Sequence, residues 1–318
     1  MISQTLQLYD NRPDVTLTTY VLSDSPELLG GKKRPAVLVC PGGAYLACSD
    51  REGEPVALRF AAMGYHAFVL RYSTYSGGRL GRLPLGADMP VNPNSLYPAP
   101  MRDIGKAFLA LRAHADEWLI DMEKVAICGF SAGAHNCAMY SVYWQDPVIT
   151  EFFGEAPAAF KPAAAILAYA VCDYHLMFGE ITDPFAQQLS NAASIAYMGT
   201  TSPSPELLDT LSPALHVSKN TPPTFLWATA ADALVPVENT VRMAAALARA
   251  GVPFEVHIFE QGQHGLSLAD QSTASSLMEI DVEAQKWVSL VEAWLKKRFA
   301  LPLPSQPAWM APQEAGKE

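Results

Sequence analysis

Residues 124–133 read KVAICGFSAG, and this stretch decides the fold of the chain. The apolar run that ends at Cys128 is typical of a buried parallel strand. The G-x-S-x-G pattern after it predicts a tight strand-to-helix turn with Ser131 at its apex, and with glycines where side chains would collide with backbone. A helix that begins at this turn directs its N–H groups toward the serine. Ser131 is therefore a candidate nucleophile.

The same alternation of apolar runs and helical periodicity continues on both sides of this stretch. The other apolar runs cover residues 36–40, 66–72, 163–169, 224–229 and 254–259. Strands that alternate with helices indicate an α/β fold, a mostly parallel central sheet with helices on both faces. Ligands of such sheets bind beyond the carboxyl ends of the strands. The residues that directly follow each strand are therefore the candidates for a site.

The chain shows no internal repeat and no break in composition, so we expect a single domain over residues 1–300. Residues 173–215 are irregular and rich in proline, which predicts a small helical cap insertion. Residues 73–98 form a long loop, and its part 76–95 could cover the site or pack in a homodimer; the sequence does not choose. A Pro-rich tail, 301–318, ends the chain.

Composition excludes several classes of partner. The net charge is −10, with 22 Lys and Arg against 32 Asp and Glu, which disfavours nucleic acid and anionic membrane. No apolar run is long enough to span a bilayer, and the N-terminus has neither the basic nor the apolar region of a secretory signal. The five cysteines form no C-x-x-C pair and no set with zinc-ligand spacing. We therefore expect a cytoplasmic protein with reduced thiols, no metal and no cofactor.

A serine nucleophile needs a histidine that accepts its proton, and the histidine needs an acid that orients it. The histidines after the serine are His135, His175, His216, His257 and His264. His135 is too close to Ser131 along the same helix, and His257 lies inside the last predicted strand. His264 lies in the loop after that strand, at the catalytic end of the sheet, and is the candidate base.

The acid comes between the serine and the histidine in this type of fold. Asp232 follows the predicted strand 224–229 and is one candidate. Asp173 follows the preceding strand and is the alternative, while Glu238 and Asp270 have weaker positions.

Several motifs resemble those of one family of enzymes. They are CPGGAY at 40–45, SDREGEPVA at 49–57, VLRYS at 69–73 and YPAPMRD at 97–103, together with the serine turn and the late Asp and His. Over about residues 35–295 the chain resembles the α/β-hydrolase esterases, in particular the bacterial acetyl-xylan-esterase-like and related lipase/esterase proteins. The resemblance implies the α/β-hydrolase fold and the catalytic residues Ser131, Asp232 and His264.

The resemblance also implies an oxyanion hole. In the family a His-Gly-Gly-Gly stretch after the first parallel strand supplies backbone donors. The matching amides here are those of Gly43 and Ala44, with that of Ala132 from the serine turn. The sequence departs from the pattern, since Pro41 replaces the His and Ala44 replaces a Gly. Ala44 keeps its N–H, so the number of donors can be preserved.

Two further groups have open interpretations. Tyr45, Tyr72 and Tyr97 are predicted to form an aromatic rim that binds substrate, although ordinary core packing suits Tyr72 better. The charged residues 50–54 either form a solvated helix N-terminus, where acids favour the macrodipole, or fix the oxyanion loop.

Together these features predict a serine carboxylesterase that hydrolyses short-chain acyl esters, for which the partner is a small-molecule ester substrate. The resemblance suggests deacetylation of sugars or xylo-oligosaccharides. One alternative is a prolyl-oligopeptidase-like peptidase, which the lack of a propeller in this sequence disfavours. The other is a non-catalytic binding protein on the hydrolase scaffold, which the complete Ser-Asp-His set disfavours.

Overall fold

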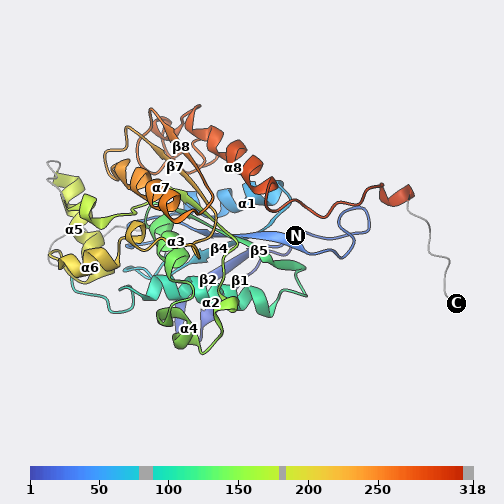
Figure 1. Cartoon of the computed structure of the whole chain (residues 1–318), viewed down its shortest axis with the longest axis horizontal. Helices are drawn as coiled ribbons and strands as arrows, with labels where there is room; N and C mark the ends of the chain where they lie inside the picture. Colours follow the sequence, from blue (N-terminus) through green and yellow to red (C-terminus); the bar gives the residue numbers. More distant parts are fainter. Residues whose placement is uncertain (79–88, 179–183, 311–318) are drawn as a thin grey trace.

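An eight-stranded sheet runs through the centre of the molecule in the computed structural model, which describes residues 1–78, 89–178 and 184–310 (Figure 1). The strands are β1 (Thr5–Tyr9), β2 (Arg12–Tyr20), β3 (Arg34–Cys40), β4 (His66–Arg71), β5 (Ile120–Phe130), β6 (Ala164–Ala168), β7 (Thr224–Thr229) and β8 (Phe254–Phe259). Their order is β1-β2-β4-β3-β5-β6-β7-β8. The pairs β1–β2 and β2–β4 are antiparallel and all other pairs are parallel, which confirms the predicted fold class.

Helices cover both faces of the sheet (Figure 1). They are α1 (Glu54–Ala62), α2 (Ala99–Ala113), α3 (Ala132–Tyr143), α4 (Pro147–Phe153), α5 (Pro184–Met198), α6 (Pro205–Thr210), α7 (Glu238–Ala250) and α8 (Trp287–Lys296). One core cluster joins the sheet to α2, α3 and α7, and a second joins the other face to α1 and α8. The central strands of the sheet are therefore buried on both sides.

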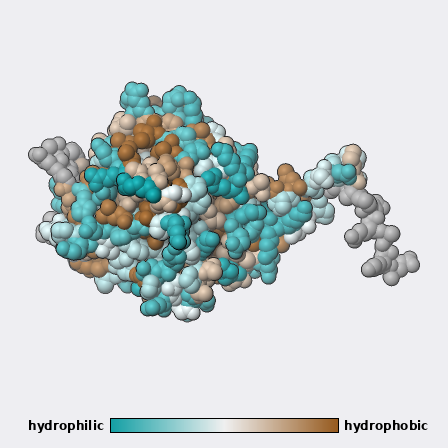
Figure 2. Space-filling view, in the orientation of Figure 1, coloured by the Kyte–Doolittle hydropathy of each residue, from teal (hydrophilic) through white to brown (hydrophobic). Residues whose placement is uncertain are grey.

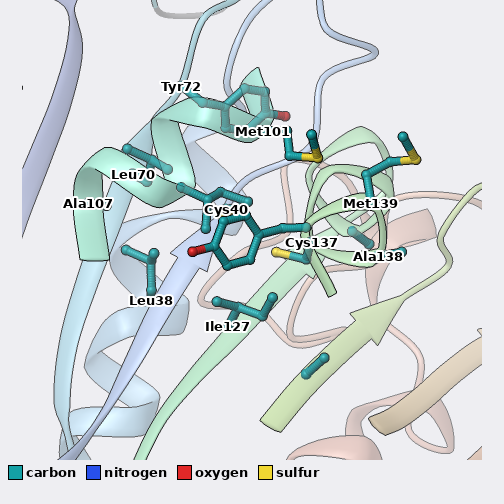
Figure 3. Close-up of a cluster of buried hydrophobic side chains, with 14 of the residues drawn as sticks. Leu38, Cys40, Leu70, Tyr72, Met101, Ala107, Ile127, Cys137, Ala138 and Met139 are labelled. Carbon is teal, nitrogen blue, oxygen red and sulfur yellow. The ribbon is translucent and has the colours of Figure 1, made fainter. Parts of the chain in front are cut away.

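The strand sequences explain this double burial. Successive side chains of a strand point to opposite faces, so Leu38 enters the first cluster while Val37 and Val39 enter the second. Figure 3 shows the first cluster, where Leu38 and Ile127 from neighbouring strands meet helix residues such as Met101 and Cys137. A strand that is apolar at every position suits this position in the sheet, whereas an alternating strand would leave polar groups in the core.

Of the two edge strands, β1 was not among the predicted strands, whereas β8 was predicted with the bounds that it has. The residues of β1 are exposed or half-buried except Leu8, which is buried. β8 forms the opposite edge, and Phe254, Val256 and Ile258 on it are 36%, 36% and 44% exposed. Figure 2 shows brown, apolar residues at the surface in the region of β8 and α7.

The predicted cap, residues 173–215, contains α5, α6 and two 3-10 turns, Tyr174–Met177 and Pro213–Leu215. Figure 1 shows α5 and α6 together on the left side of the molecule. Parts of three predicted segments fall outside the described residues, namely 79–88 of the long loop, 179–183 of the cap and 311–318 of the tail.

All five cysteines are buried and free. Of the helices in the described ranges, none has the length and apolar character needed to cross a membrane.

Candidate active site

Ser131 lies at the tight turn between β5 and α3, as the G-x-S-x-G pattern predicts. Its backbone has φ 52° and ψ −120°, a left-handed conformation that is strained for a residue with a side chain. Its N–H donates to the carbonyl of Ala168 at 3.0 Å, which anchors the turn to β6. A Cβ on Gly133 would lie 2.1 Å from the carbonyl oxygen of Cys40, so only glycine allows α3 to approach the end of β3.

The structure brings Ser131, His264 and Asp232 into one hydrogen-bonded line. Ser131 Oγ lies 2.8 Å from His264 Nε2, and His264 Nδ1 lies 2.7 Å from Asp232 Oδ2. Since a carboxylate only accepts, Nδ1 carries the proton and Nε2 is free to accept the serine proton. The other oxygen of Asp232 accepts from the backbone N–H groups of Leu234 and Val235, both at 2.9 Å. The carboxylate is thus held in place from both sides.

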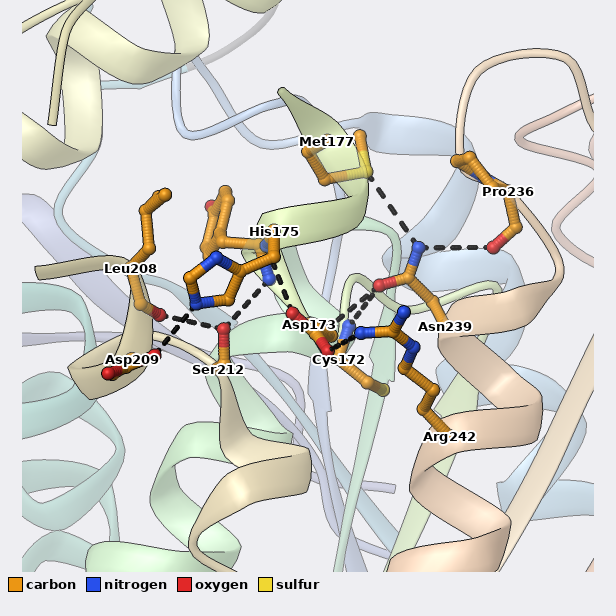
Figure 4. Close-up of polar contacts among 11 residues, drawn as sticks. Cys172, Asp173, His175, Met177, Leu208, Asp209, Ser212, Pro236, Asn239 and Arg242 are labelled. Atoms are coloured by element: carbon orange, nitrogen blue, oxygen red, sulfur yellow. Dashed lines mark hydrogen bonds and ion pairs between the residues drawn. The ribbon is translucent and has the colours of Figure 1, made fainter. Parts of the chain in front are cut away.

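The alternative acid, Asp173, has a different partner. One of its oxygens pairs with the guanidinium of Arg242, and the other accepts from the backbone N–H of His175 (Figure 4). Asn239 closes this cluster, since its side-chain oxygen accepts from the N–H groups of Cys172 and Asp173 at 2.9 Å. The cluster joins the start of the cap to α7 and takes no part in orienting His264.

The two weaker acid candidates are also occupied elsewhere. Asp270 pairs with Arg59 at 3.0 Å, and Glu238 is exposed in the first turn of α7.

The predicted oxyanion donors have free N–H groups. Within the described ranges, the backbone amides of Gly43 and Ala44 have no hydrogen-bond partner, and neither does that of Ala132 at the first position of α3. Gly43 has φ 126° and Ala44 has φ 56°, so this turn is held in the left-handed region. A Cβ on Gly43 would lie 2.2 Å from the carbonyl oxygen of Ala47, which explains the glycine.

Two of the three predicted rim tyrosines are buried, so the structure does not place them on an exposed rim. Tyr45 is 2% exposed and its hydroxyl lies 2.6 Å from His135 Nδ1. Tyr72 is 1% exposed and donates to the carbonyl of Pro41 at 2.7 Å. Both hydroxyls thus anchor the oxyanion turn, residues 41–45 with the predicted oxyanion donors, from inside the protein. Tyr97 is half-buried and lies edge-on to Tyr197 of the cap.

His135 takes part in this support rather than in proton transfer. It is fully buried, and its Nε2 donates to the carbonyl of Leu211 at 2.9 Å while Nδ1 accepts from Tyr45. Burial lowers the pKa of His135 to about 4, so the ring is neutral. Tyr45 also stacks on Tyr197, with ring centroids 4.0 Å apart.

A buried carboxylate, Glu52, lies beside the oxyanion turn. Its Oε2 accepts from the backbone N–H of Gly42 at 2.7 Å and its Oε1 accepts from the hydroxyl of Tyr169 at 2.7 Å. Of the charged residues at 50–54, this is the one with a role inside the protein. The sequence pattern left the role of Glu52 open. It gave no signal for Tyr169, which was not among the predicted site residues.

In the part of the chain that the structure describes, no three His, Cys, Asp or Glu side chains are grouped so that they could hold a metal ion.

Comparison with known proteins identifies the family of the chain. The BD-FAE family model matches residues 88–247, which is half of the chain. The endo-1,4-beta-xylanase B of Butyrivibrio fibrisolvens is 34% identical over 75% of this chain, and the match spans 33% of that protein. This chain therefore corresponds to about a third of the length of that relative.

Solved structures match over nearly the whole chain. The acetyl ester-xyloside bifunctional hydrolase from Caldicellulosiruptor lactoaceticus has a TM-score of 0.71 and 29% identity, with 92% of this chain and 96% of that one covered. The carboxylesterase Cest-2923 from Lactobacillus plantarum WCFS1 has a TM-score of 0.73 and 26% identity, with 93% and 96% covered. With the sheet order and the Ser131 turn, these matches show that the chain belongs to the BD-FAE family of α/β-hydrolases.

Proposed function

We propose that this protein is a serine carboxylesterase that removes short acyl groups, and acetyl groups on sugars or xylo-oligosaccharides in particular. The observation that carries the proposal is the line from Ser131 Oγ through His264 to Asp232, with hydrogen bonds of 2.8 and 2.7 Å. The free amides of the oxyanion turn and the names of the solved relatives support it.

The mechanism follows from these positions. Ser131 Oγ attacks the ester carbonyl while His264 Nε2 accepts its proton. The carbonyl oxygen becomes an oxyanion, which the amides of Gly43, Ala44 and Ala132 stabilise by hydrogen bonds. His264 then protonates the leaving alcohol, and an acyl-enzyme remains on Ser131. Water attacks the acyl-enzyme with His264 again as base, which releases the acid and restores the serine.

The proposed substrates, acetylated sugars or xylo-oligosaccharides, are inferred from the relatives. An acetyl ester-xyloside hydrolase and a carboxylesterase are among the similar structures, which favours a short acyl group and a carbohydrate alcohol. Acetate release from acetylated xylo-oligosaccharides measures this directly.

The test compares p-nitrophenyl acetate, butyrate and octanoate as substrates of the wild type and of Ser131→Ala. We expect the short esters to be preferred and the variant to lose at least about 10³-fold in kcat. The matched control is Ser141→Ala, because Ser141 is a buried serine of α3, the helix that follows Ser131, and donates to the carbonyl of Cys137 in its own helix. An inert wild type, or a Ser131→Ala variant that keeps its activity, would disprove the mechanism. Cleavage of a peptide p-nitroanilide in place of esters would favour the peptidase.

A further inference from the structure

Glu52 is an unusual residue to find in the interior. It is 4% exposed and lies in the 3-10 turn Asp50–Glu52, which follows the oxyanion turn. Burial raises its pKa, because a carboxylate loses its hydration there, whereas its hydrogen bonds from Tyr169 and Gly42 oppose that rise. A residue that is costly to bury must be compensated by specific contacts.

Those contacts join two separate parts of the site. On one side Oε2 accepts from the N–H of Gly42, the residue next to the predicted donor Gly43. On the other side Oε1 accepts from the hydroxyl of Tyr169, whose oxygen accepts from the backbone N–H of Ser267 at 3.0 Å. Ser267 is in the loop that carries His264. One carboxylate is therefore linked to both the oxyanion turn and the histidine loop.

The packing at Gly42 shows how little freedom this arrangement has. A Cβ on Gly42 would lie 2.7 Å from Glu52 Oε2 and 2.9 Å from the Cβ of Ser131. The turn thus sits between the carboxylate and the nucleophile. Tyr169 also packs edge-on to His264, with ring centroids 5.0 Å apart. A shift of Glu52 or Tyr169 would move the donors and the base relative to Ser131.

We propose that Glu52 is a positioning residue, which through Gly42 and through Tyr169 holds the oxyanion donors and the His264 loop in register with Ser131. The inference rests on the proposed ester hydrolysis. Backbone donors stabilise the oxyanion only where they are already aimed at it, so a small displacement lowers the rate although no donor is lost.

The test uses Glu52→Gln and Tyr169→Phe. Glutamine keeps the shape of Glu52, but it presents one oxygen and one NH₂ group, so it cannot accept from both donors. Phenylalanine at 169 removes the hydroxyl that joins Glu52 to Ser267. The matched control is Glu54→Gln, since Glu54 is exposed two residues along the chain and accepts from the hydroxyl of Tyr20 at 2.9 Å, away from Gly42 and Tyr169.

Two quantities are measured, the kinetics on p-nitrophenyl acetate and the Ki of a short trifluoromethyl ketone. The ketone adds to Ser131 as a hemiketal whose oxyanion occupies the same hole. We expect Glu52→Gln and Tyr169→Phe each to lower kcat by about 10- to 100-fold, with KM within about twofold of the wild type. Their Ki should rise by the factor by which kcat/KM falls. Glu54→Gln should match the wild type in both.

The Ki separates positioning from a purely structural role, because it does not depend on how much of a sample is folded. A variant that merely folds less well loses kcat with an unchanged Ki, and that result would overturn the inference. If Glu52→Gln does not fold, Tyr169→Phe carries the test alone. If both fold, the double variant should lose little more than the worse single one, because the two residues act as one unit.

The outcomes also distinguish this inference from the proposed function. An active enzyme that depends on Ser131, yet has unchanged kcat/KM and Ki in both variants, overturns the inference alone. A wild type without Ser131-dependent esterase activity overturns both.

Discussion

Asp232 Oδ2 lies 2.7 Å from His264 Nδ1, while Asp232 Oδ1 accepts two backbone N–H groups from its own loop. The side chain of Asp232 is 1% exposed, so this contact is screened little by water. The residue that orients the histidine is thereby itself oriented by the chain that follows it.

This relationship predicts the effect of Asp232→Asn. An amide can place an NH₂ group toward His264, which would favour the tautomer with its proton on Nε2 and leave no acceptor for the serine proton. We expect kcat on p-nitrophenyl acetate to fall by about 10⁴-fold. The control is Asp173→Asn, since Asp173 pairs with Arg242 instead, and its kcat should stay within about tenfold of the wild type. Equal losses in the two variants would contradict the assignment of the acid.

Gly133→Ala tests the packing under the nucleophile. The added Cβ would lie 2.1 Å from the carbonyl oxygen of Cys40 and 2.3 Å from that of Pro41, and both are backbone atoms that cannot turn away. We expect the free energy of unfolding to fall by at least about 2 kcal/mol, measured by urea unfolding. Gly78→Ala is the control, because among the described residues no atom lies within 4 Å of a Cβ placed there. A fully stable Gly133→Ala variant would show that α3 can move away from β3.

Tyr45→Phe tests the support of the oxyanion turn. The substitution removes the hydroxyl that lies 2.6 Å from His135 but keeps the ring stacked on Tyr197. Because Ala44 and Tyr45 have left-handed backbones at φ 56° and 58°, the turn needs such an anchor. We expect kcat to fall by about tenfold with little change in KM.

The control for this substitution is Tyr143→Phe, which removes a hydroxyl that donates to the carbonyl of Thr210 at 3.1 Å, away from the turn. It should leave kcat unchanged. If the two variants behave alike, the hydroxyl of Tyr45 has no special role in the turn.

Because His135 is buried, we expect the free energy of unfolding to depend on pH. Burial lowers its pKa to about 4 from the ordinary 6.5, so between these values the unfolded chain binds more protons than the folded one. The stability from neutral His135 is fully present above pH 6.5 and is lost as the pH falls toward 4. From pH 7 to pH 5 this single group should cost about 2 kcal/mol of unfolding free energy.

Urea unfolding of the wild type and of His135→Gln at both pH values measures this. The variant should be less stable at pH 7 but should lose less on acidification. His175→Gln is the control, since His175 is exposed on the cap, and its pH dependence should follow that of the wild type. An identical pH dependence in His135→Gln and the wild type would remove His135 as the cause.

Much of the fold and two residues of the candidate site, Ser131 and His264, could be predicted from local pattern. The stretch 124–133 specifies a buried strand, a tight turn and a helix, because the apolar run and the two glycines act within a few residues of one another. The position of His264 after the last strand followed in the same way, since parallel strands deliver their carboxyl ends to one edge of the sheet. That argument left both Asp173 and Asp232 open as the acid, and the choice of Asp232 came from the resemblance to the esterase family. That the side chains of Ser131, His264 and Asp232 meet at hydrogen-bond distance was not contained in the pattern.

Tertiary structure alone decided the remaining questions. It decided that Asp173 pairs with Arg242, that Tyr45 and Tyr72 support the oxyanion turn from inside, and that Glu52 bridges to Tyr169. Each of these contacts joins residues 31 to 117 positions apart. Tyrosine and carboxylate side chains occur at the surface and, when their polar atoms are hydrogen-bonded, also in the interior. The sequence pattern therefore leaves both interpretations open. Which of them holds depends on the partner that the folded chain brings within reach.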